Sequence, residues 1–139
     1  MRLGECIMSQ SPLLVFESSA FAVVPGEDEE TNPGIDGQAL ANWLAEQLRA
    51  GGIPAGTVFA EDFGWCVPVA SEHHALYAVC ASAETPDQWQ VFVFAEGGLF
   101  ARMLGKDGRA ESVSSLFAAV RHCLESPPSV GGLREEPVR

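Results

Sequence analysis

The clearest pattern in the chain is a run of apolar positions at the three-and-four spacing of an amphipathic helix. Leu40, Leu44 and Leu48, together with Trp43, recur at this spacing, and polar residues lie between them. Two glycines and a proline follow, which end a helix and prevent it from continuing. The pattern predicts a helix over residues 36–50.

The start of this helix follows several residues of the types that cap free amide groups. Thr31, Asn32 and Asp36 all belong to these types, and Pro33 suits the first turn of a helix. The sequence leaves open which of the three side chains forms the cap.

Runs of β-branched and aromatic residues predict a sheet. The expected strands cover residues 13–16, 21–24, 57–60, 65–70, 73–82 and 89–95, with 57–60 as a short strand or an extended linker. Short connections make the last three an antiparallel meander, and Pro68 places its strand at an edge or a bulge. Apolar positions at helical spacing from Val113 to Leu124 predict a second helix. The expected fold is α+β: a two-layer sandwich of two main helices on an antiparallel sheet of about four to five strands.

The ends of the chain differ in composition from its middle. Residues 1–12 are expected to be a disordered N-terminal segment, 13–126 a single α+β domain, and 127–139 a disordered tail of proline, glycine and charge. The first segment carries too little charge and apolar sequence for a secretory signal, and Met8 is an alternative to Met1 as the start.

The strand WQVFVFA is apolar on both of its faces. Trp89, Val91 and Val93 form one face, and Phe92 and Phe94 form the other, as in a strand buried on both sides. Two helices cover one face of such a sheet, so the second face becomes an apolar patch of the kind that marks partner surfaces. The sequence therefore predicts a dimer or an obligate complex, unless residues 99–104 and the N-terminal segment fold over this face.

The net charge of -11 excludes some classes of partner. Such a surface repels nucleic acids and acidic membranes, and no apolar run approaches the length of a membrane span. The acidic run Glu27–Glu30 is expected to be a solvated loop. The alternative is a cation site or a surface for a basic partner, although the run lacks the ligand spacing of an EF-hand.

The four cysteines, Cys6, Cys66, Cys80 and Cys123, show no close pairing and are expected to be free thiols in a reducing cytosol. This predicts a cytoplasmic protein.

A hairpin that turns on residues 72–74 would place Cys66 opposite Cys80, with His73 and His74 at the turn, in a set that suits zinc. Adjacent strand residues point to opposite faces, however, so we do not expect both histidines to share one metal. Cysteines scattered in strands are expected to be small core hydrophobes.

Cys66 and the His122–Cys123 pair come without a nucleophile elbow or an acid–base partner. The sequence therefore favours a protein that is not an enzyme, with no catalytic, cofactor or metal residues.

The remaining candidate chemistry flanks the first helix. Glu61 and Asp62 precede Phe63-Gly64-Trp65, and with Asn32 they would meet at one end of the sandwich as a small-molecule pocket. The alternative is structural: the acids cap backbone amides while the two aromatic residues enter the core. The candidate binding residues are Asn32, Trp43, Glu61, Asp62, Trp65, Phe92 and Phe94.

The segments TNPGIDGQALANWL, EDFGWCVPV and DQWQVFVFAE resemble a family of small uncharacterised bacterial proteins, over about residues 20–125. This resemblance implies a fold and no activity. LANWLAEQLRAGGIP, EDFGWCVPV and HHALYAVCA are more loosely similar to type III secretion chaperones, which are small, acidic, dimeric α+β proteins that bind unfolded effectors. Those chaperones begin with a helix, whereas this chain begins with apparent strands.

The leading hypothesis is a non-enzymatic, acidic, cytosolic protein-binding module, such as a secretion chaperone or an immunity protein. Its partner would be a basic protein or a second copy of the chain. The alternative is a small-molecule-binding or enzymatic domain with a pocket near Asn32, Glu61 and Asp62.

Overall fold

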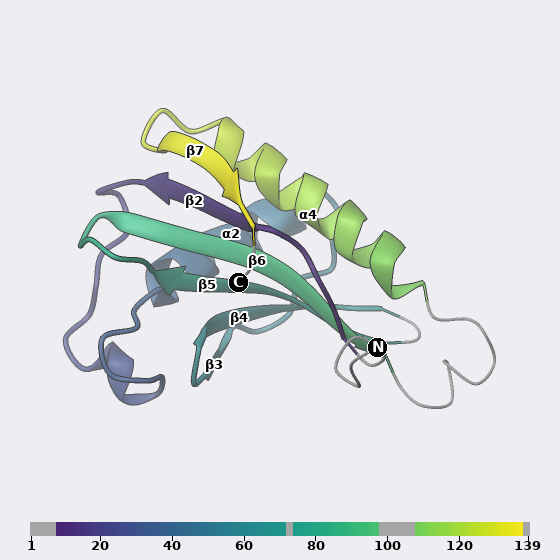
Figure 1. Ribbon diagram of the computed structural model, residues 1–139, viewed down its shortest axis with the longest axis horizontal. Helices are drawn as coiled ribbons and strands as arrows, with labels where there is room; N and C mark the ends of the chain where they lie inside the picture. Colours follow the sequence, from purple (N-terminus) through teal and green to yellow (C-terminus); the bar gives the residue numbers. More distant parts are fainter. Residues whose placement is uncertain (1–7, 72–73, 98–107, 138–139) are drawn as a thin grey trace.

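The computed structural model describes residues 8–71, 74–97 and 108–137. Over these ranges the chain is α+β, with two helices against an antiparallel sheet, as the sequence predicts (Figure 1). The elements are β1 (Met8–Gln10), β2 (Leu13–Glu17), the 3-10 helix η1 (Glu27–Glu29), α2 (Gln38–Ala50), β3 (Phe59–Glu61), β4 (Gly64–Val69), β5 (His74–Ser82), β6 (Gln88–Gly97), α4 (Arg109–Glu125) and β7 (Gly131–Glu136).

The described strands form one seven-stranded sheet in the order β3-β4-β5-β6-β2-β7, and β1 also pairs with β6. All the pairings are antiparallel. The predicted meander of β4, β5 and β6 is confirmed, and it forms the middle of the sheet. The sheet has more strands than expected because two of them, β1 and β7, lie in segments that were expected to be disordered.

The tail prediction for residues 127–139 is wrong over β7. This strand pairs with β2, with Glu135 opposite Leu14 and Arg134 opposite Val15. Glu135 also forms an ion pair with Arg121 of α4, which ties the strand to the helix layer. Charged side chains are common on edge strands because they discourage pairing with other chains, so the polar composition of β7 fits its place at the edge of the sheet.

The predicted strand at residues 21–24 is also absent: this segment is a loop. Val23 and Val24 are 47% and 57% exposed, and only Phe21 packs inward, against the rings of Trp43 and Trp89. The edge of β6 beside this loop is taken by β2, whose outer edge is taken by β7, so the segment has no strand to join.

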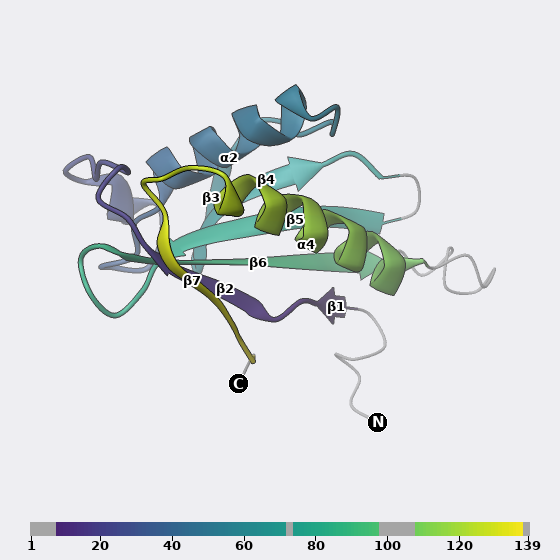
Figure 2. The same cartoon turned by 90° about the horizontal axis from the view of Figure 1, so that it is seen from above.

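Both helices lie on the same face of the sheet. α2 packs over β4 and β5, and α4 packs over β5 and β6 (Figure 2). The core between the layers includes Leu40, Leu44 and Leu48, which the helical spacing placed on one face of α2, and the fully buried Trp89 of β6. Truncating a buried leucine of this kind to alanine costs about 2–5 kcal/mol. Among the described residues, no helix is both long and apolar enough to cross a lipid bilayer.

The N-terminus of α2 is capped from ten residues away, by the first residue of η1. The N–H groups of Gly37 and Gln38 donate to Oε2 of Glu27 at 3.0 Å each, and the N–H of Val24 donates to Oε1 at 2.7 Å. The side chains of Thr31, Asn32 and Asp36 therefore do not form the cap that the sequence suggested. Thr31 instead donates to the carbonyl of Ile35 at 2.6 Å and holds the loop closed.

The acidic run is only partly the solvated loop that was expected. Glu27 is buried as the helix cap, and Asp28 accepts the N–H of Gly34 at 2.8 Å. Glu29 and Glu30 are exposed. Half of the run thus has a structural role in shaping the loop before α2.

Pro68 lies in the part of β4 that β3 does not reach. β3 pairs only with residues 64–66 of β4, while Pro68 pairs with Tyr77 on its other side. Its carbonyl accepts the N–H of Gly56 at 2.7 Å. β3 ends before it reaches Pro68, so β3 does not need the amide donor that this proline lacks. This agrees with the prediction that Pro68 lies at an edge.

Candidate functional site

The face of the sheet opposite the two helices, called the open face below, carries a group of aromatic side chains. β6 has Trp89, Val91 and Val93 in the helix-covered core, whereas Phe94 belongs to a second cluster on the other face and Phe92 packs against it. The apolar character of both faces of this strand, predicted from its sequence, is present in the structure. Among the described residues no helix packs on the open face (Figure 2).

The rings on the open face form a continuous chain of contacts, called the aromatic patch below. Phe59, Tyr77, Phe94 and Phe63 follow one another with centroid separations of 5.7, 5.0 and 6.2 Å, and Phe92 adjoins Phe94 at 6.2 Å. Several of these pairs have the edge-to-face or tilted geometry that aromatic rings prefer.

Strand register explains why these rings meet. Tyr77 lies opposite Phe94, and Val79 lies opposite both Cys66 and Phe92. Phe63 lies in the tight turn between β3 and β4 and is 43% exposed, so its ring closes over the patch from the side. The patch is therefore built from three strands and one hairpin turn.

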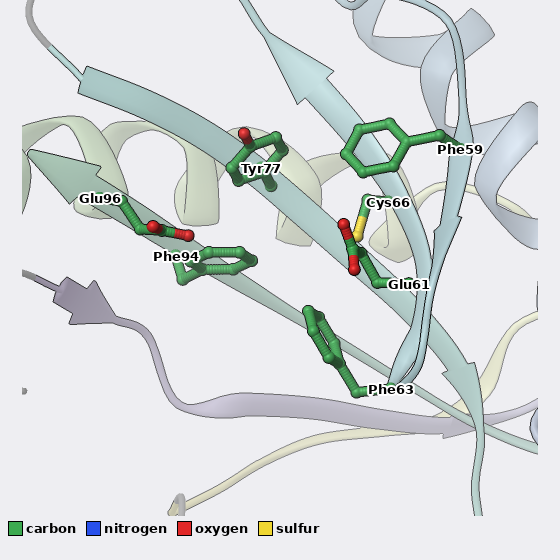
Figure 3. A pocket seen from close by; sticks show the side chains of 7 residues that line it. All are labelled: Phe59, Glu61, Phe63, Cys66, Tyr77, Phe94 and Glu96. Atoms are coloured by element: carbon green, nitrogen blue, oxygen red, sulfur yellow. The ribbon is translucent and has the colours of Figure 1, made fainter. Parts of the chain in front are cut away.

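Two carboxylates flank a hollow in the patch, called the aromatic pocket below. Its volume is about 150 Å³. Figure 3 shows Glu61 pointing between the rings of Phe59 and Phe63, with Glu96 beside Phe94 at the far end. The walls are Phe59, Glu61, Phe63, Cys66, Tyr77, Phe94 and Glu96. A second hollow of about 250 Å³ shares Phe63, Phe94 and Glu96 and continues the groove toward Phe92 and Gln10.

The electrostatic environment of the pocket is negative. Burial raises the pKa of Tyr77, and the charges of Glu96 and Glu61 raise it further. Burial, together with the charge of Glu61, raises the pKa of Cys66 to about 12. Burial penalises a charge of either sign, whereas the charges of Glu61 and Glu96 disfavour a further negative charge and favour a cation.

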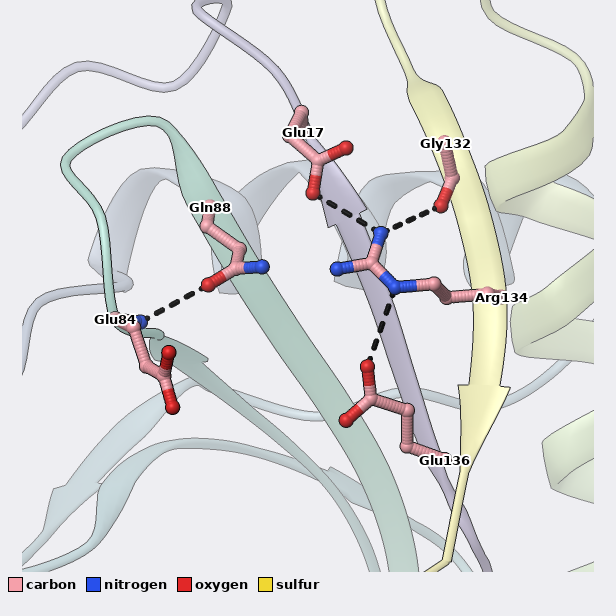
Figure 4. Close-up of polar contacts among 6 residues, drawn as sticks. All are labelled: Glu17, Glu84, Gln88, Gly132, Arg134 and Glu136. Atoms are coloured by element: carbon pink, nitrogen blue, oxygen red, sulfur yellow. Dashed lines mark hydrogen bonds and ion pairs between the residues drawn. The ribbon is translucent and has the colours of Figure 1, made fainter.

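The other end of the open face is polar, and its carboxylates share one arginine. Arg134 of β7 donates to Glu17 and Glu136 at 3.1 and 3.2 Å, and the side chain of Gln88 accepts the N–H of Glu84 (Figure 4). Within the described residues, no ion pair involves Glu61 or Glu96. The two ends of the open face thus differ. At the polar end Arg134 lies between two carboxylates, whereas at the aromatic end no cation from the described residues pairs with Glu61 or Glu96.

Asn32 and the Glu61–Asp62 turn do meet, as the sequence suggested. The N–H of Asn32 donates to the carbonyl of Asp62 at 2.8 Å, so the two loops are joined through their backbones. The Asn32 side chain is exposed, and the walls of the aromatic pocket beside Glu61 do not include it. This contact joins the two loops at a corner of the fold, and a small-molecule pocket near Asn32, Glu61 and Asp62 stays a prediction.

The two tryptophans among the candidate residues lie on the helix side. Trp65 is buried in the core between sheet and helices, while Trp43 of α2 is half-buried and contacts Phe21. The structural interpretation of the EDFGW segment is thus right for Trp65 and wrong for Phe63, which lies on the open face. Neither tryptophan reaches the aromatic patch.

The cysteine–histidine grouping does not form among the described residues. Cys66 lies opposite Val79, and Cys80 lies opposite Trp65, one position away from the predicted register, so the two thiols point to opposite faces. Burial raises the pKa of Cys80. His73 lies outside the described residues, which contain no group of three or more ligands arranged for a metal.

Sequence reasoning missed most of the pocket. Phe59, Phe63, Cys66, Tyr77 and Glu96 were not among the candidate binding residues, although Glu61 and Phe94 were. The signal for Tyr77 was present: in an antiparallel pair, residues directly opposite share a face, and a tight β5–β6 connection brings it opposite Phe94. Phe63 gave no such signal, because a turn residue can point to either face.

Searches against protein-family models, curated proteins and solved structures returned no match. The interpretation of the site therefore depends on its geometry and chemistry alone.

Proposed function

We propose that this chain is a non-enzymatic, acidic protein-binding module that acts in the cytosol and uses the open face to bind a protein partner. The observation that carries this proposal is the aromatic patch, a continuous chain of rings on a face that no described helix covers. Phe63 is exposed and Phe59, Tyr77 and Phe92 are half-buried, while Phe94 is already buried. A partner that covers the exposed parts of these rings gains the free energy of burying them.

The charge of the chain supports a basic partner. The net charge is -11, and two exposed carboxylates, Glu61 and Glu96, lie within the aromatic surface itself. Such a surface attracts basic proteins over long range and repels acidic ones, so it selects the partner and speeds the encounter. A secretion chaperone or a toxin-neutralising immunity protein has this kind of surface, and we propose these as the concrete versions of the function.

The test compares the purified protein with two variants at exposed apolar positions. Phe63→Ser removes the most exposed ring of the patch, and Val24→Ser removes a similarly exposed side chain that is not part of the patch. Each protein is immobilised and exposed to an extract of the source organism. We expect wild type and Val24→Ser to retain the same proteins and Phe63→Ser to lose them.

A mass measurement in solution separates the two kinds of partner. A dimer that Phe63→Ser dissociates would identify the partner as a second copy of the chain. A monomer that captures the same proteins with and without Phe63, or captures none, would contradict the proposed function. Thermal melting of each variant confirms that the comparison is made on folded protein.

A further inference from the structure

The aromatic pocket combines aromatic walls with carboxylates, and each of these features alone would bind a different class of ligand. Its ring walls, Phe59, Tyr77 and Phe94, suit an apolar group, whereas Glu61 and Glu96 suit a cation. An apolar side chain in this space would strip water from the carboxylates without compensating their charge, which is costly. An anionic group such as a phosphate would meet like charges. A cation with an apolar stem satisfies both features at once.

Aromatic rings attract cations in their own right. A guanidinium or ammonium within about 6 Å of a ring centroid is stabilised by the negative face of the ring. In the pocket the ring centroids of neighbouring residues are 5.0 to 6.2 Å apart, so one cation can approach more than one ring. The carboxylates at the two ends lie where N–H donors of such a group would emerge (Figure 3).

The size of the pocket limits the ligand. A volume of about 150 Å³ matches that of a cavity that holds one benzene-sized group. This is room for the head group of one long side chain and its last methylene groups, and not for a folded surface. The shared groove toward Phe92 extends the surface along the strand, which suits a partner segment in extended conformation.

We propose that the aromatic pocket binds the cationic head group of an arginine or lysine from a basic segment of the protein partner. This inference deepens the proposed function and depends on it, because it assigns the chemical class of the group that the open face recognises. Burial raises the pKa of Tyr77 most, and the charges of Glu96 and Glu61, which raise it further, also favour a cation in the pocket.

The chain offers a built-in reporter for the test, since Tyr77 is its single tyrosine and forms a wall of the pocket. In protein labelled with ¹³C-tyrosine, the ring signals report Tyr77 alone. The probes are methylguanidinium chloride, which carries the arginine head group, and methylurea, its neutral isostere, with sodium chloride at matched ionic strength.

We expect methylguanidinium to shift the Tyr77 signals in a saturable way and methylurea to bind roughly tenfold more weakly or not at all. Glu61→Gln and Glu96→Gln should each weaken methylguanidinium binding by about two- to fivefold. Glu84→Gln removes the same charge from the polar end of the open face and should leave the affinity within about a factor of 1.5. Equal shifts by methylurea, or an equal loss in Glu84→Gln, would overturn the inference.

A second arm connects the pocket to a protein segment. A heptapeptide that alternates arginine with valine should produce the same Tyr77 shifts at lower concentration, and its citrulline counterpart should not. If both peptides bind alike and Phe63→Ser weakens both, the cation inference fails while the protein-binding function stands. If the captured proteins are also indifferent to Phe63, the proposed function itself fails.

Discussion

The buried carboxylate of Glu27 closes the N-terminus of α2 by accepting the N–H of Gly37 at 3.0 Å. The same side chain accepts the N–H of Gln38 and, through its other oxygen, that of Val24. One residue thus fixes the loop before η1, the start of the helix and the direction of the chain between them. A negative charge in this place is also favoured by the helix dipole.

Replacing Glu27 with glutamine should destabilise the protein by about 1–3 kcal/mol, because the amide nitrogen would face N–H donors that have lost their acceptor. Urea denaturation followed by circular dichroism measures this difference. Glu30→Gln, an exposed position in the same acidic run, should change the free energy of unfolding by less than about 0.5 kcal/mol. Equal stability of the two variants would contradict the capping role.

Gly37 and Gly64 should not tolerate a side chain. Both have positive φ, and a Cβ at either position would lie 2.8 Å from the carbonyl oxygen of Cys80. Alanine at either position should lower the free energy of unfolding by more than about 1 kcal/mol. Gly51→Ala, where the added methyl finds ordinary van der Waals distances, should leave the stability unchanged or raise it by up to about 1 kcal/mol. Thermal or urea unfolding of the three variants, side by side, measures the difference.

Asp36 should reduce stability at neutral pH. Burial, with the nearby charges of Glu27 and Asp28, raises its pKa above the ordinary value of 3.8. A carboxyl group whose pKa is raised in the folded state favours folding when protonated, and that contribution is lost as the pH rises through the folded pKa. Asp36→Asn should therefore be more stable than wild type at pH 7, and the gap should narrow toward pH 4. Urea titrations at each pH measure the free energy of unfolding of both proteins. A stability difference between Asp36→Asn and wild type that is the same at pH 7 and pH 4 would contradict this role of Asp36.

The described cysteines should differ in reactivity toward iodoacetamide. A pKa of about 12 leaves Cys66 with roughly one thiolate in ten thousand at pH 8, and Cys80 is buried with a raised pKa as well. Cys123, half-buried on α4, should be alkylated first of the three. Peptide mass mapping of native and urea-unfolded protein checks the order. Labelling of Cys66 at the unfolded rate would show that the open face unfolds locally.

Local patterns predicted the elements whose formation depends on their own residues. The leucine spacing identified α2, which runs to Ala50 as expected, and the β-branched and aromatic run at 89–95 identified β6. Elements that depend on distant partners could not be predicted in this way. Residues 21–24 have the composition of a strand but form a loop beside β2, which already pairs with β6 and β7. β7 has the composition of a tail but pairs with the outer edge of β2.

The candidate site was predicted in the same uneven way. The alternation of β6 placed Phe92 and Phe94 opposite the helix-covered core without any knowledge of the other strands. The same alternation places Glu96 on that face, just beyond the predicted strand 89–95. Tyr77 required the register between β5 and β6, and Phe63 required the direction of a turn. The zinc hypothesis failed for this reason, because a register shifted by one position sends Cys66 and Cys80 to opposite faces.

The pairing of β2 with β7 constrains the order in which the protein can fold during its synthesis. β2 emerges from the ribosome before β7, which is the last described strand to be translated. Until residues 131–136 appear, the outer edge of β2 has its backbone groups open to any extended chain nearby, a risk for nascent polypeptides. Completion of the sheet is therefore a late, long-range event, of the kind that makes folding slow.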